Sequence, residues 1–579
     1  MPEGKLRDPE ELRQEAGIDA PPEKKTKVEK LKLESNGLRG NVKEELEDSS
    51  TQNVSQDSYQ LMKHFGIYQQ DNRDTRIERK RAGKEKEWIF MLRTKIPGGA
   101  ATAKQYLAMD NIADKHANGS LRLTTRQTVQ FHGVVKGSLR PLVNDLNDSL
   151  LTAYGACGDV VRNTMADPVA EISSDPIYSC AGEMLELARA ISDRYLPRSR
   201  SYFDIFIDDE NVTEDLAPKA VHDETEETYG TTYMPRKFKI GITVPESNSV
   251  DIFTQDIGLV ALRGKRGNLT GYNILIGGGL GFSHNKPHTY PRTGTAVAYV
   301  KRNDVLDAVH AIITIQRDYG DRTDRAQARL KYLVDRVGIK WFHEEMERRT
   351  GKAFARPRKV TNWGFDDHLG WHEQKDGLLY VGVFVENGRI AGKQREKIRR
   401  IVEEFQPQVR ITPQQNLVLS HIAPGNRAAV QAILDDGAGL VGNGALSQIR
   451  RNQIACVALP TCGLALAESE RVLPTLIGKL EEMGYGKERI SIRMSGCPNS
   501  CSRAPVAEIG LFGRAPGKYN MHVGGDYLGT RTNLLFKESV LFEDLPQEIG
   551  RLIDRWRRER HNGEAFGDYC LRVGVEALQ

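Results

Sequence analysis

The sequence predicts an α+β protein built on a duplicated half-domain, with two further α/β domains that complete a pseudo-two-fold arrangement. An internal repeat is the first observation: GGAATAKQ at 98–105 is echoed by NGRIAGKQ at 387–394, and LRLTTRQT at 121–128 by VRITPQQN at 409–416. The second observation is that strand-like and helix-like stretches alternate in the same order in both copies. Length is the third, because 579 residues exceed what one hydrophobic core organises, so about three domains are expected.

The first predicted element is a charged N-terminal arm over residues 1–58. It contains PPEKKTKVEK and VKEELEDSS and is nearly free of aromatic residues, so it cannot bury enough apolar surface to fold alone. Interleaved glutamates favour a solvated arm, or a segment that docks a partner, over a patch that binds polyanions.

Two ferredoxin-like half-repeats are predicted over 59–155 and 357–429. Each is expected to run strand, turn, helix, strand, and the two would pair into one core. The predicted elements are IFMLRTKI, QYLAMDNIADKHA and LRLTTRQTVQFHGV in the first copy, and LYVGVFV, QREKIRRIVEEF and VRITPQQNLVLSHI in the second. The sequence between and after them, 156–356 and 430–579, supplies one α/β domain for each half.

Four of the seven cysteines form two pairs in the C-terminal third, Cys456-x5-Cys462 and Cys497-x3-Cys501. Thiolates are soft ligands, and four of them at two short spacings can surround an iron–sulfur cluster. Structural zinc is an alternative, although zinc pairs are usually separated by two to four residues. Disulfides are a second alternative, but the cysteine count is odd and no secretory signal is evident.

Composition excludes several function classes. The 82 basic and 78 acidic residues leave a formal charge of +4, which is too balanced for a nucleic-acid-binding protein. No apolar run approaches the length of a transmembrane helix, and the N-terminus has no signal-peptide pattern. We therefore expect a soluble cytoplasmic protein with no nucleic-acid or membrane partner.

Basic residues concentrate on the repeat and just beyond it. Alternation along LRLTTRQTVQFHG places Arg122, Thr124, Arg126, Gln130 and His132 at even positions of one predicted strand, so that some share a face. Two arginines on one strand favour an anionic ligand, with a solvated sheet edge as the alternative. Further basic residues follow in MLRTKIPGG, ACGDVVRN and YMPRKFK, namely Arg93, Arg162, Arg236, Lys237 and Lys239.

The chain resembles the siroheme-containing sulfite and nitrite reductases along nearly its whole length. The resemblance rests on the order of many stretches: HFGIYQQDNRD, MLRTKIPGG, LRLTTRQTVQFHG, GACGDVVRN, YMPRKFK, GYNILIGGGLG, QRDYGDRTDRAQARLKY, GWHEQKDG, VRITPQQN, ACVALPTCG and MSGCPNSCSRAP. It implies the family's duplicated fold, in which the cofactors lie between pseudo-equivalent halves.

The cofactors that the resemblance implies are siroheme and a 4Fe–4S cluster. The cluster would be held by Cys456, Cys462, Cys497 and Cys501, with Cys501 also axial to the siroheme iron. Siroheme carries many carboxylates, so its pocket needs cations. The matching macrocycle contacts are Arg122, Thr124, Arg126, Gln130, His132 and Arg236, and Gly277, Gly278 and Gly279 would let the backbone approach the ring. The glycine run lacks the G-x-G-x-x-G spacing of a nicotinamide site.

The activity that the resemblance implies is the six-electron reduction of sulfite to sulfide, in sulfate assimilation and cysteine biosynthesis. Arg93, Arg162, Lys237 and Lys239 match the family's substrate-binding cations. Arginine keeps its proton, so we expect the arginines to clamp the oxyanion and the lysines to supply protons. The K-x-K pair is typical of the sulfite reductases, and ferredoxin-dependent reduction of nitrite to ammonia is the alternative function.

The electron donor is expected to be a separate protein, because the chain has no flavin or nicotinamide signature. An NADPH-dependent flavoprotein and a ferredoxin both fit the family, and the charged arm slightly favours the flavoprotein as a docking partner. Some relatives join a cysteine near Cys157 covalently to a tyrosine, for which Tyr68 is the candidate. A plain buried thiol is the alternative for Cys157.

Overall fold

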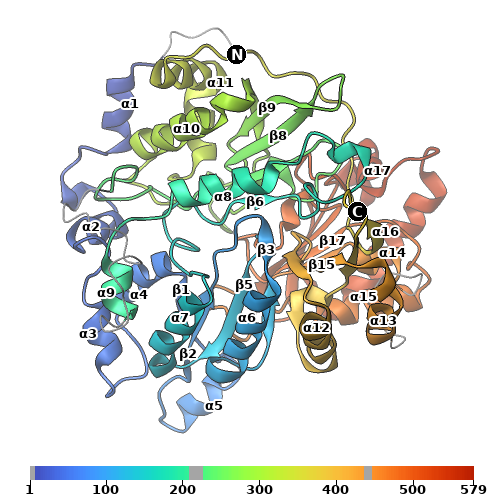
Figure 1. Ribbon diagram of the computed structural model, residues 1–579, viewed down its shortest axis with the longest axis horizontal. Coiled ribbons are helices and arrows are strands. Elements are labelled where there is room, and N and C mark those ends of the chain that lie inside the picture. Colours follow the sequence, from blue (N-terminus) through green and yellow to red (C-terminus); the bar gives the residue numbers. More distant parts are fainter. Residues whose placement is uncertain (1–6, 208–225, 436–445) are drawn as a thin grey trace.

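The computed structural model describes residues 7–207, 226–435 and 446–579. Within these ranges, four five-stranded sheets form two pairs of equivalent topology. Figure 1 shows the first half-repeat (blue) and the second (yellow to orange) side by side below, with one α/β domain (green) above and the other (red) to one side.

The two half-repeat sheets complete one another by exchanging a strand. The first sheet has the order β1 (Ile67–Asp71), β2 (Trp88–Arg93), β5 (Val129–Val134), β4 (Leu121–Leu123), β13 (Arg389–Ile390). The second has the order β11 (Gly370–Glu373), β12 (Leu379–Val383), β15 (Leu417–Ile422), β14 (Gln408–Ile411), β3 (Ala100–Ala101). Thus β13 from the second copy pairs with β4 of the first, and β3 from the first pairs with β14 of the second. The predicted pseudo-two-fold fold is confirmed by this reciprocal exchange.

Two glycines allow the exchanged strands to approach so closely. Gly99 has φ +72°, and a Cβ there would lie 2.6 Å from the carbonyl oxygen of Ile411. Its counterpart Gly388 has φ +77°, and a Cβ there would lie 2.6 Å from the carbonyl oxygen of Leu123. Any other residue would combine a left-handed backbone with a clash against the partner strand, so the repeat requires glycine at both places.

The segment 121–134 was expected to be one strand and is instead a hairpin, so that expectation is wrong. Strands β4 and β5 are antiparallel and joined by a tight tip, in which the Thr124 N–H donates to the Thr128 carbonyl at 2.9 Å. The Thr124 hydroxyl also accepts from the Thr128 N–H, so side-chain bonds replace a strand ladder. The second copy repeats this tip between Thr412 and Asn416. The tip therefore directs Arg126 out of the sheet.

The two α/β domains share one sheet topology. Their sheets are β6 (Met165–Ala166), β7 (Ile240–Thr243), β8 (Ile257–Arg263), β9 (Leu269–Ile276) and β10 (Thr295–Lys301), and β16 (Gln453–Ala455), β17 (Ile492–Ser495), β18 (Ile509–Ala515), β19 (Lys518–Val523) and β20 (Leu534–Leu541). In each, the first three strands are parallel and the last two are antiparallel. The duplication therefore extends beyond the half-repeats to the α/β domains.

Helices cover the sheets and close two large hydrophobic cores, beside two smaller clusters. One core joins the N-terminal segment, both half-repeats and the first α/β domain, and the other lies within the last domain. The α-helices are α1 (Pro9–Ala16), α2 (Lys27–Glu34), α3 (Val42–Glu47), α4 (Gln56–Met62), α5 (Arg76–Arg81), α6 (Ala103–His116), α7 (Leu139–Asp148), α8 (Met184–Arg194), α9 (Ser201–Phe206), α10 (Val305–Tyr319), α11 (Leu330–Thr350), α12 (Gly392–Phe405), α13 (Arg427–Leu434), α14 (Gln448–Arg451), α15 (Leu473–Glu482), α16 (Leu545–Glu559), α17 (Phe566–Val573) and α18 (Val575–Leu578). Of the helices described, none has the length and apolar character needed to cross a membrane.

The N-terminal segment is not a solvated arm, and that expectation is wrong. Residues 7–58 carry helices α1 to α3 and the start of α4, which run along one side of the molecule (Figure 1) and bury Leu12, Leu38 and Val42 completely. Two of its charged residues, Glu29 and Lys32, are each 1% exposed. Ion pairs with the body compensate their burial, which a reading of composition cannot reveal. Residues 1–6 of the predicted arm lie outside the described residues.

Candidate active site

The four cysteines lie at one edge of the last sheet. Cys456 follows β16 and Cys497 follows β17, and these neighbouring strands are parallel, so their carboxyl ends meet at the same edge. The Gly496 N–H donates to Cys456 Sγ at 3.2 Å, and the Asn499 amide donates to Cys497 Sγ at 3.6 Å. The sequence therefore brings both pairs together and supplies N–H groups to their sulfur atoms.

The thiols crowd one another. Burial, and then the neighbouring Cys501, raises the pKa of Cys497 to about 12. Burial followed by Cys501 and Cys497 likewise raises the pKa of Cys456 well above its usual value. Such a quartet holds thiolates only when a strongly cationic centre offsets their charge, which is the chemistry of a bound cluster.

The four thiols are not preformed as a single-ion site. In the three described ranges, no group of three or more His, Cys, Asp or Glu side chains is arranged to hold one metal ion. The donors of tetrahedral zinc meet at one point, about 2.3 Å from each sulfur.

Cys501 lies beside the hairpin tip of the first half-repeat. Its side chain is exposed, and its carbonyl accepts a hydrogen bond from the Thr125 hydroxyl at 2.9 Å. Arg503 bonds back to the Thr125 carbonyl at 2.9 Å and to the Pro413 carbonyl at 2.9 Å. Both hairpin tips, one from each half-repeat, are thus fixed against the last cysteine loop.

Cations surround the space in front of Cys501. Burial lowers the pKa of Lys239 well below its usual value, and the next contributions come from Arg329 and Arg126, while Cys501 opposes them. Burial, then Arg236 and Lys239, lowers the pKa of Lys237 in the same way. Both lysines lie just before β7 and flank Phe238, whose backbone bridges Val161. The structure therefore brings the predicted K-x-K pair to the last cysteine.

Arg126 and Arg329 have unused hydrogen-bonding capacity. Burial and Arg162 lower the pKa of Arg126 to about 9, and its Nε is buried without a hydrogen-bond partner among the described residues. Arg329 is 7% exposed, and two of its guanidinium nitrogens have no hydrogen-bond partner in the same ranges, although Nη2 lies 3.6 Å from the Asp256 carboxylate. Buried donors without acceptors are costly, so this pocket fits a ligand that carries several carboxylates, as siroheme does.

Arg93 and Arg162 lie around Cys157, within electrostatic reach of Arg126. Arg93 Nη1 is 3.2 Å from Cys157 Sγ, and its other nitrogens reach the Gln130 amide oxygen once that amide is turned over. Arg162 binds the Gly158 carbonyl at 3.0 Å. Burial, and then Cys157, raises the pKa of the Tyr68 hydroxyl, so the predicted pair of Tyr68 and Cys157 is adjacent. A covalent bond between them stays a prediction.

Arg122 has protein partners for its whole guanidinium group. It pairs with Glu470 at 2.7 Å and donates to the Ala455 carbonyl at 2.9 Å, and Arg389 pairs with the same glutamate. Burial raises the pKa of Glu470, but Arg122 and Arg389 outweigh it and lower the pKa to about 2. Arg122 therefore links the first half-repeat to the last α/β domain. Its expected contact with the macrocycle stays a prediction.

The glycine run contacts protein rather than open space. A Cβ at Gly278 would lie 2.4 Å from the carbonyl oxygens of Phe253 and Gln255, and one at Gly279 would lie 2.9 Å from the Arg329 guanidinium. Gly277 has φ +76°. Close packing against residues 253–255 and Arg329 thus accounts for the glycines, which sequence reasoning had explained only by approach to a ring.

Sequence reasoning missed several residues of the site. Arg329 and Lys331 occur in the quoted stretch RAQARLKY but were not singled out, and Arg503 follows the last cysteine by two residues. Lys331 donates to the Gly281 carbonyl at 2.8 Å, and burial followed by Arg329 lowers its pKa to about 6. The sequence does not show that Arg329 and Lys331 belong to the site, because they reach it only when the start of α11 packs beside the glycine run.

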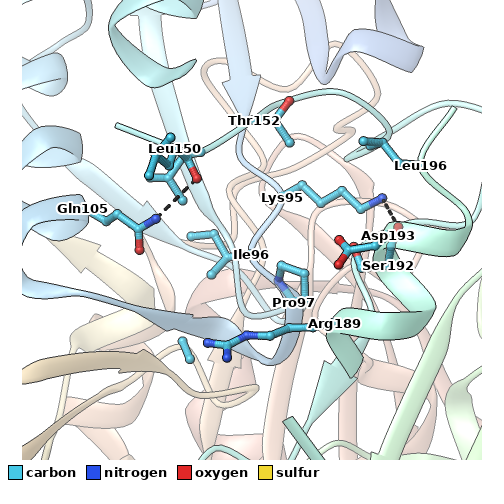
Figure 2. A pocket seen from close by; sticks show the side chains of 12 residues that line it. Lys95, Ile96, Pro97, Gln105, Leu150, Thr152, Arg189, Ser192, Asp193 and Leu196 are labelled. Atoms are coloured by element: carbon cyan, nitrogen blue, oxygen red, sulfur yellow. Dashed lines mark hydrogen bonds between the residues drawn. The ribbon is translucent and has the colours of Figure 1, made fainter. Parts of the chain in front are cut away.

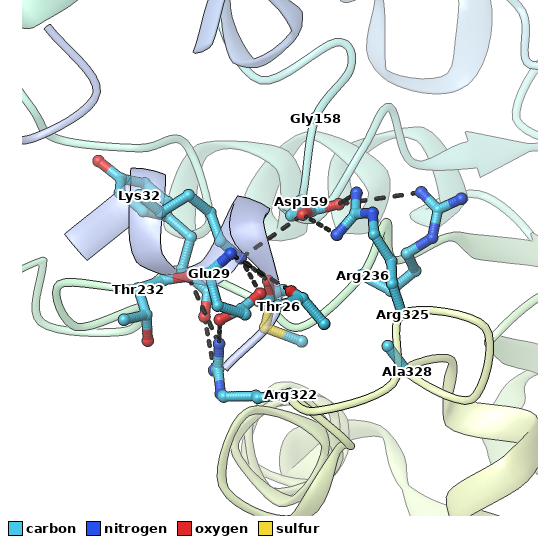
Figure 3. Close-up of polar contacts among 12 residues, drawn as sticks. Thr26, Glu29, Lys32, Gly158, Asp159, Thr232, Arg236, Arg322, Arg325 and Ala328 are labelled. Atoms are coloured by element: carbon cyan, nitrogen blue, oxygen red, sulfur yellow. Dashed lines mark hydrogen bonds and ion pairs between the residues drawn. The ribbon is translucent and has the colours of Figure 1, made fainter. Parts of the chain in front are cut away.

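A buried ion network holds the loop that precedes the K-x-K pair (Figure 3). Asp159 accepts from Arg325 at 2.9 Å and lies 3.5 Å from Lys32 Nζ and 4.0 Å from Arg236. Lys32 also donates to the Met234 carbonyl at 2.8 Å. Arg236 thus shares a carboxylate with the N-terminal segment and is not free to face the pocket alone.

A separate cavity of about 240 Å³ lies beside α8 and contains none of the predicted site residues (Figure 2). Lys95 is 4% exposed at its wall, and its Nζ donates to the Ser192 carbonyl at 3.4 Å. Burial lowers the pKa of Lys95 to about 8. No cysteine of the quartet lines this cavity, and it is not the candidate active site.

Comparisons with known proteins place the chain among similar sequences and folds. A family model described as the nitrite and sulphite reductase 4Fe-4S domain matches residues 157–354, and one described as the nitrite/sulfite reductase ferredoxin-like half domain matches 81–149 and 372–437. The first match covers the α/β domain that lacks the cysteine quartet, whose sheet has the same topology as that of the cluster domain.

The curated relatives are similar along nearly their whole length. The chain is 42% identical over 568 residues to the sulfite reductase (NADPH) hemoprotein beta-component of Geobacillus kaustophilus, covering 96% of both chains. It is also 42% identical to the protein of the same name from Staphylococcus haemolyticus, covering 95% of both. Among solved structures, the Mycobacterium tuberculosis NirA protein superposes with a TM-score of 0.72 at 24% identity, over all of this chain and 98% of that one. That structure supports the fold alone.

Proposed function

The chain belongs to the siroheme- and 4Fe–4S-containing nitrite and sulfite reductase family, and from that premise we propose that it reduces sulfite to sulfide with electrons from an NADPH-oxidising flavoprotein. The carrying observation is the gathering of Arg126, Arg329 and the K-x-K pair in front of Cys501. An NADPH-linked donor would place the reaction in the cytoplasm.

The cofactors would be held by residues that fit them. Cys456, Cys462, Cys497 and Cys501 would ligate the cluster, and Arg126 and Arg329 would pair with siroheme carboxylates. When bound, the pair supplies an open iron for the substrate and electrons delivered one at a time.

The protein side chains would do the remaining work. Arg93 and Arg162 are permanent cations that can clamp a small oxyanion beside Cys157. Lys237 and Lys239 have lowered pKa values, because burial and neighbouring cations disfavour their charged forms, so they release protons readily to the oxygens that leave as water. Two arginines that stay charged and two lysines that donate protons suit sulfite, which must lose three oxygens as water.

The substrate preference for sulfite over nitrite rests on Lys239. The named curated relatives carry the sulfite reductase name, and a second lysine adds a proton source near the iron-facing cysteine. Nitrite is also a small anion and would enter the same pocket, so reduction of nitrite to ammonia is a secondary activity of this site.

An absorption spectrum and two assays test the proposal. Purified protein with its iron should show a Soret band and a red-shifted band from siroheme above the broad absorption of the cluster, and should release sulfide from sulfite with reduced methyl viologen. NADPH with the flavoprotein should also drive the reaction. Protein that binds iron but no tetrapyrrole, or that forms no sulfide with viologen, would contradict the proposed function.

A further inference from the structure

The loop that carries Cys462 reaches the molecular surface. Cys462 is partly exposed, Gly463 is exposed, Leu464 is 65% exposed and Leu466 is 39% exposed. Of the other three cysteines of the quartet, Cys456 is also partly exposed, Cys497 is buried and Cys501 is exposed. Residues 461–466 therefore bring one cysteine of the quartet to the surface, where a partner protein can approach it.

A basic segment is fastened beside this loop. The Arg73 N–H donates to the Pro460 carbonyl at 3.1 Å, and its guanidinium donates to the carbonyls of Ala465 at 2.6 Å and Cys462 at 3.3 Å. An ion pair of 2.6 Å between Arg471 and Asp74 adds a second tie. Helix α5 begins three residues after Arg73, so its position relative to the cluster loop is fixed.

Positive charge accumulates on this segment. Residues 76–86, RIERKRAGKEK, contain six basic and two acidic residues, and this excess of four equals the formal charge of the whole chain, +4. Arg76 pairs with Asp71. In the part of the chain that the structure describes, no ion pair engages the remaining five, which are Arg79, Lys80, Arg81, Lys84 and Lys86.

Exposed apolar side chains accompany the charge. Ile77 on α5 is 66% exposed, and Leu464 is equally open on the neighbouring loop. Apolar groups ringed by charged ones are typical of protein interfaces, in which the apolar centre supplies affinity and the charged rim steers the encounter. A partner of about standard interface size, roughly 800 Å² on each side, can cover both the loop and α5.

We propose that α5, the basic turn that follows it and the loop 461–466 form the docking surface for an acidic flavin-binding domain, which delivers electrons to the cluster through the Cys462 loop. This inference rests on the proposed function, because it assumes that the cluster accepts the electrons. At each encounter one electron leaves the reduced flavin and enters the haemoprotein, no covalent bond forms or breaks, and NADPH restores the flavin. Six such transfers, with protons from solvent, balance the reduction of one sulfite.

A matched pair of charge reversals tests the surface. Lys80→Glu with Arg81→Glu reverses two neighbouring exposed cations on α5. Lys265→Glu with Arg266→Glu reverses the same two residue types, also exposed, in the turn between β8 and β9, which lies at the opposite end of the molecule from α5 in Figure 1. Neither pair contacts the proposed active site.

The α5 variant should bind the purified oxidised flavoprotein about tenfold more weakly at low ionic strength, and its NADPH-driven kcat/KM for the flavoprotein should fall by a similar factor. Its binding should also lose most of the salt dependence seen in the unaltered protein. The control variant should match the unaltered protein in both measurements. Sulfide release with reduced methyl viologen, a small donor that needs no docking, should be the same in all three.

Three results would overturn the proposal. Equal losses in the two variants would show a non-specific effect of net charge. A loss with viologen in the α5 variant would place the defect inside the enzyme. A loss with ferredoxin as donor but none with the flavoprotein would assign the surface to a different protein. Absence of viologen-driven turnover in the unaltered protein would instead count against the proposed function, so the two failures are distinguishable.

Discussion

Lys239 lies between cations and the last cysteine, and this position gives it two separable tasks. Its charge helps to hold an oxyanion, and its lowered pKa, caused first by burial and then by Arg329, makes it a proton donor. Arginine at this position keeps the charge but does not give up a proton. The two tasks can therefore be separated by substitution.

For Lys239→Arg we expect the KM for sulfite to stay within about threefold while kcat falls by about 100-fold or more. Lys239→Met should impair both parameters. Viologen-driven sulfide release at several sulfite concentrations measures the split, with the siroheme spectrum as a control for loading. A kcat near that of the unaltered protein in the arginine variant would rule out proton donation by Lys239.

Lys95 provides a pH-dependent stability prediction. Its folded pKa of about 8 lies below the unfolded value of 10.5, because burial disfavours the ammonium. Between pH 8 and 10.5 the unfolded chain binds more protons than the folded one, so the free energy of unfolding rises with pH. Below pH 8 the buried ammonium destabilises the folded state by its full amount. We expect Lys95→Met to stabilise the protein at pH 7 by on the order of 1–3 kcal/mol.

That gain should shrink as the pH approaches 10. Thermal unfolding at pH 7, 8.5 and 10 measures it, with Lys265→Met as an exposed control that should shift little at any pH. A gain that grows with pH would have the wrong sign for a desolvated lysine.

At the scale of elements, the sequence predicted which segments correspond to one another better than it predicted the backbone conformation of each segment. The echo of VRITPQQN predicted the duplication, and the cysteine spacing predicted four candidate metal ligands that the structure brings to one sheet edge, because both are local patterns. The hairpin at 121–134 was missed, since the alternation of its residues continues across the tip. Two of the three hydrogen bonds between Thr124 and Thr128 that close it use side chains. Arg329 and Glu470 were missed because their partners are far apart in sequence. The predicted domain boundaries stay predictions.

Helix α2 illustrates the same limit and gives a third prediction. Its charge pattern is that of a solvated helix, yet Lys32 bridges Glu29, Asp159 and the Met234 carbonyl in the interior. Lys32→Met would leave Glu29 and Asp159 with one cation fewer, which typically costs about 3–5 kcal/mol for a buried pair. We therefore expect a clear drop in the unfolding temperature.

The KM for sulfite should also rise, because Met234 precedes the K-x-K pair by three residues. Lys30→Met on the exposed face of the same helix is the matched control and should change the unfolding temperature little. Restoring part of the loss with Glu29→Gln in the same chain would support the network, and equal effects at positions 30 and 32 would contradict it.

For the whole molecule, the exchanged strands predict that the halves cannot be separated. A chain cut between residues 356 and 357 leaves β4 without β13 and β14 without β3. We expect each fragment alone to lack cooperative unfolding and to aggregate through its open sheet edge, and the two produced together to associate. Circular dichroism and size-exclusion chromatography test this, and a monomeric, cooperatively unfolding N-terminal fragment would contradict it.

The exchange also constrains what a single copy of the repeat could have been. A lone half would have an unfilled sheet position and a spare short strand, so it could become complete only by trading that strand with an identical molecule. Such a dimer would have two equivalent metal-binding faces related by a two-fold axis. Within one polypeptide the two faces are free to differ, and in this chain only the second α/β domain carries the cysteine quartet.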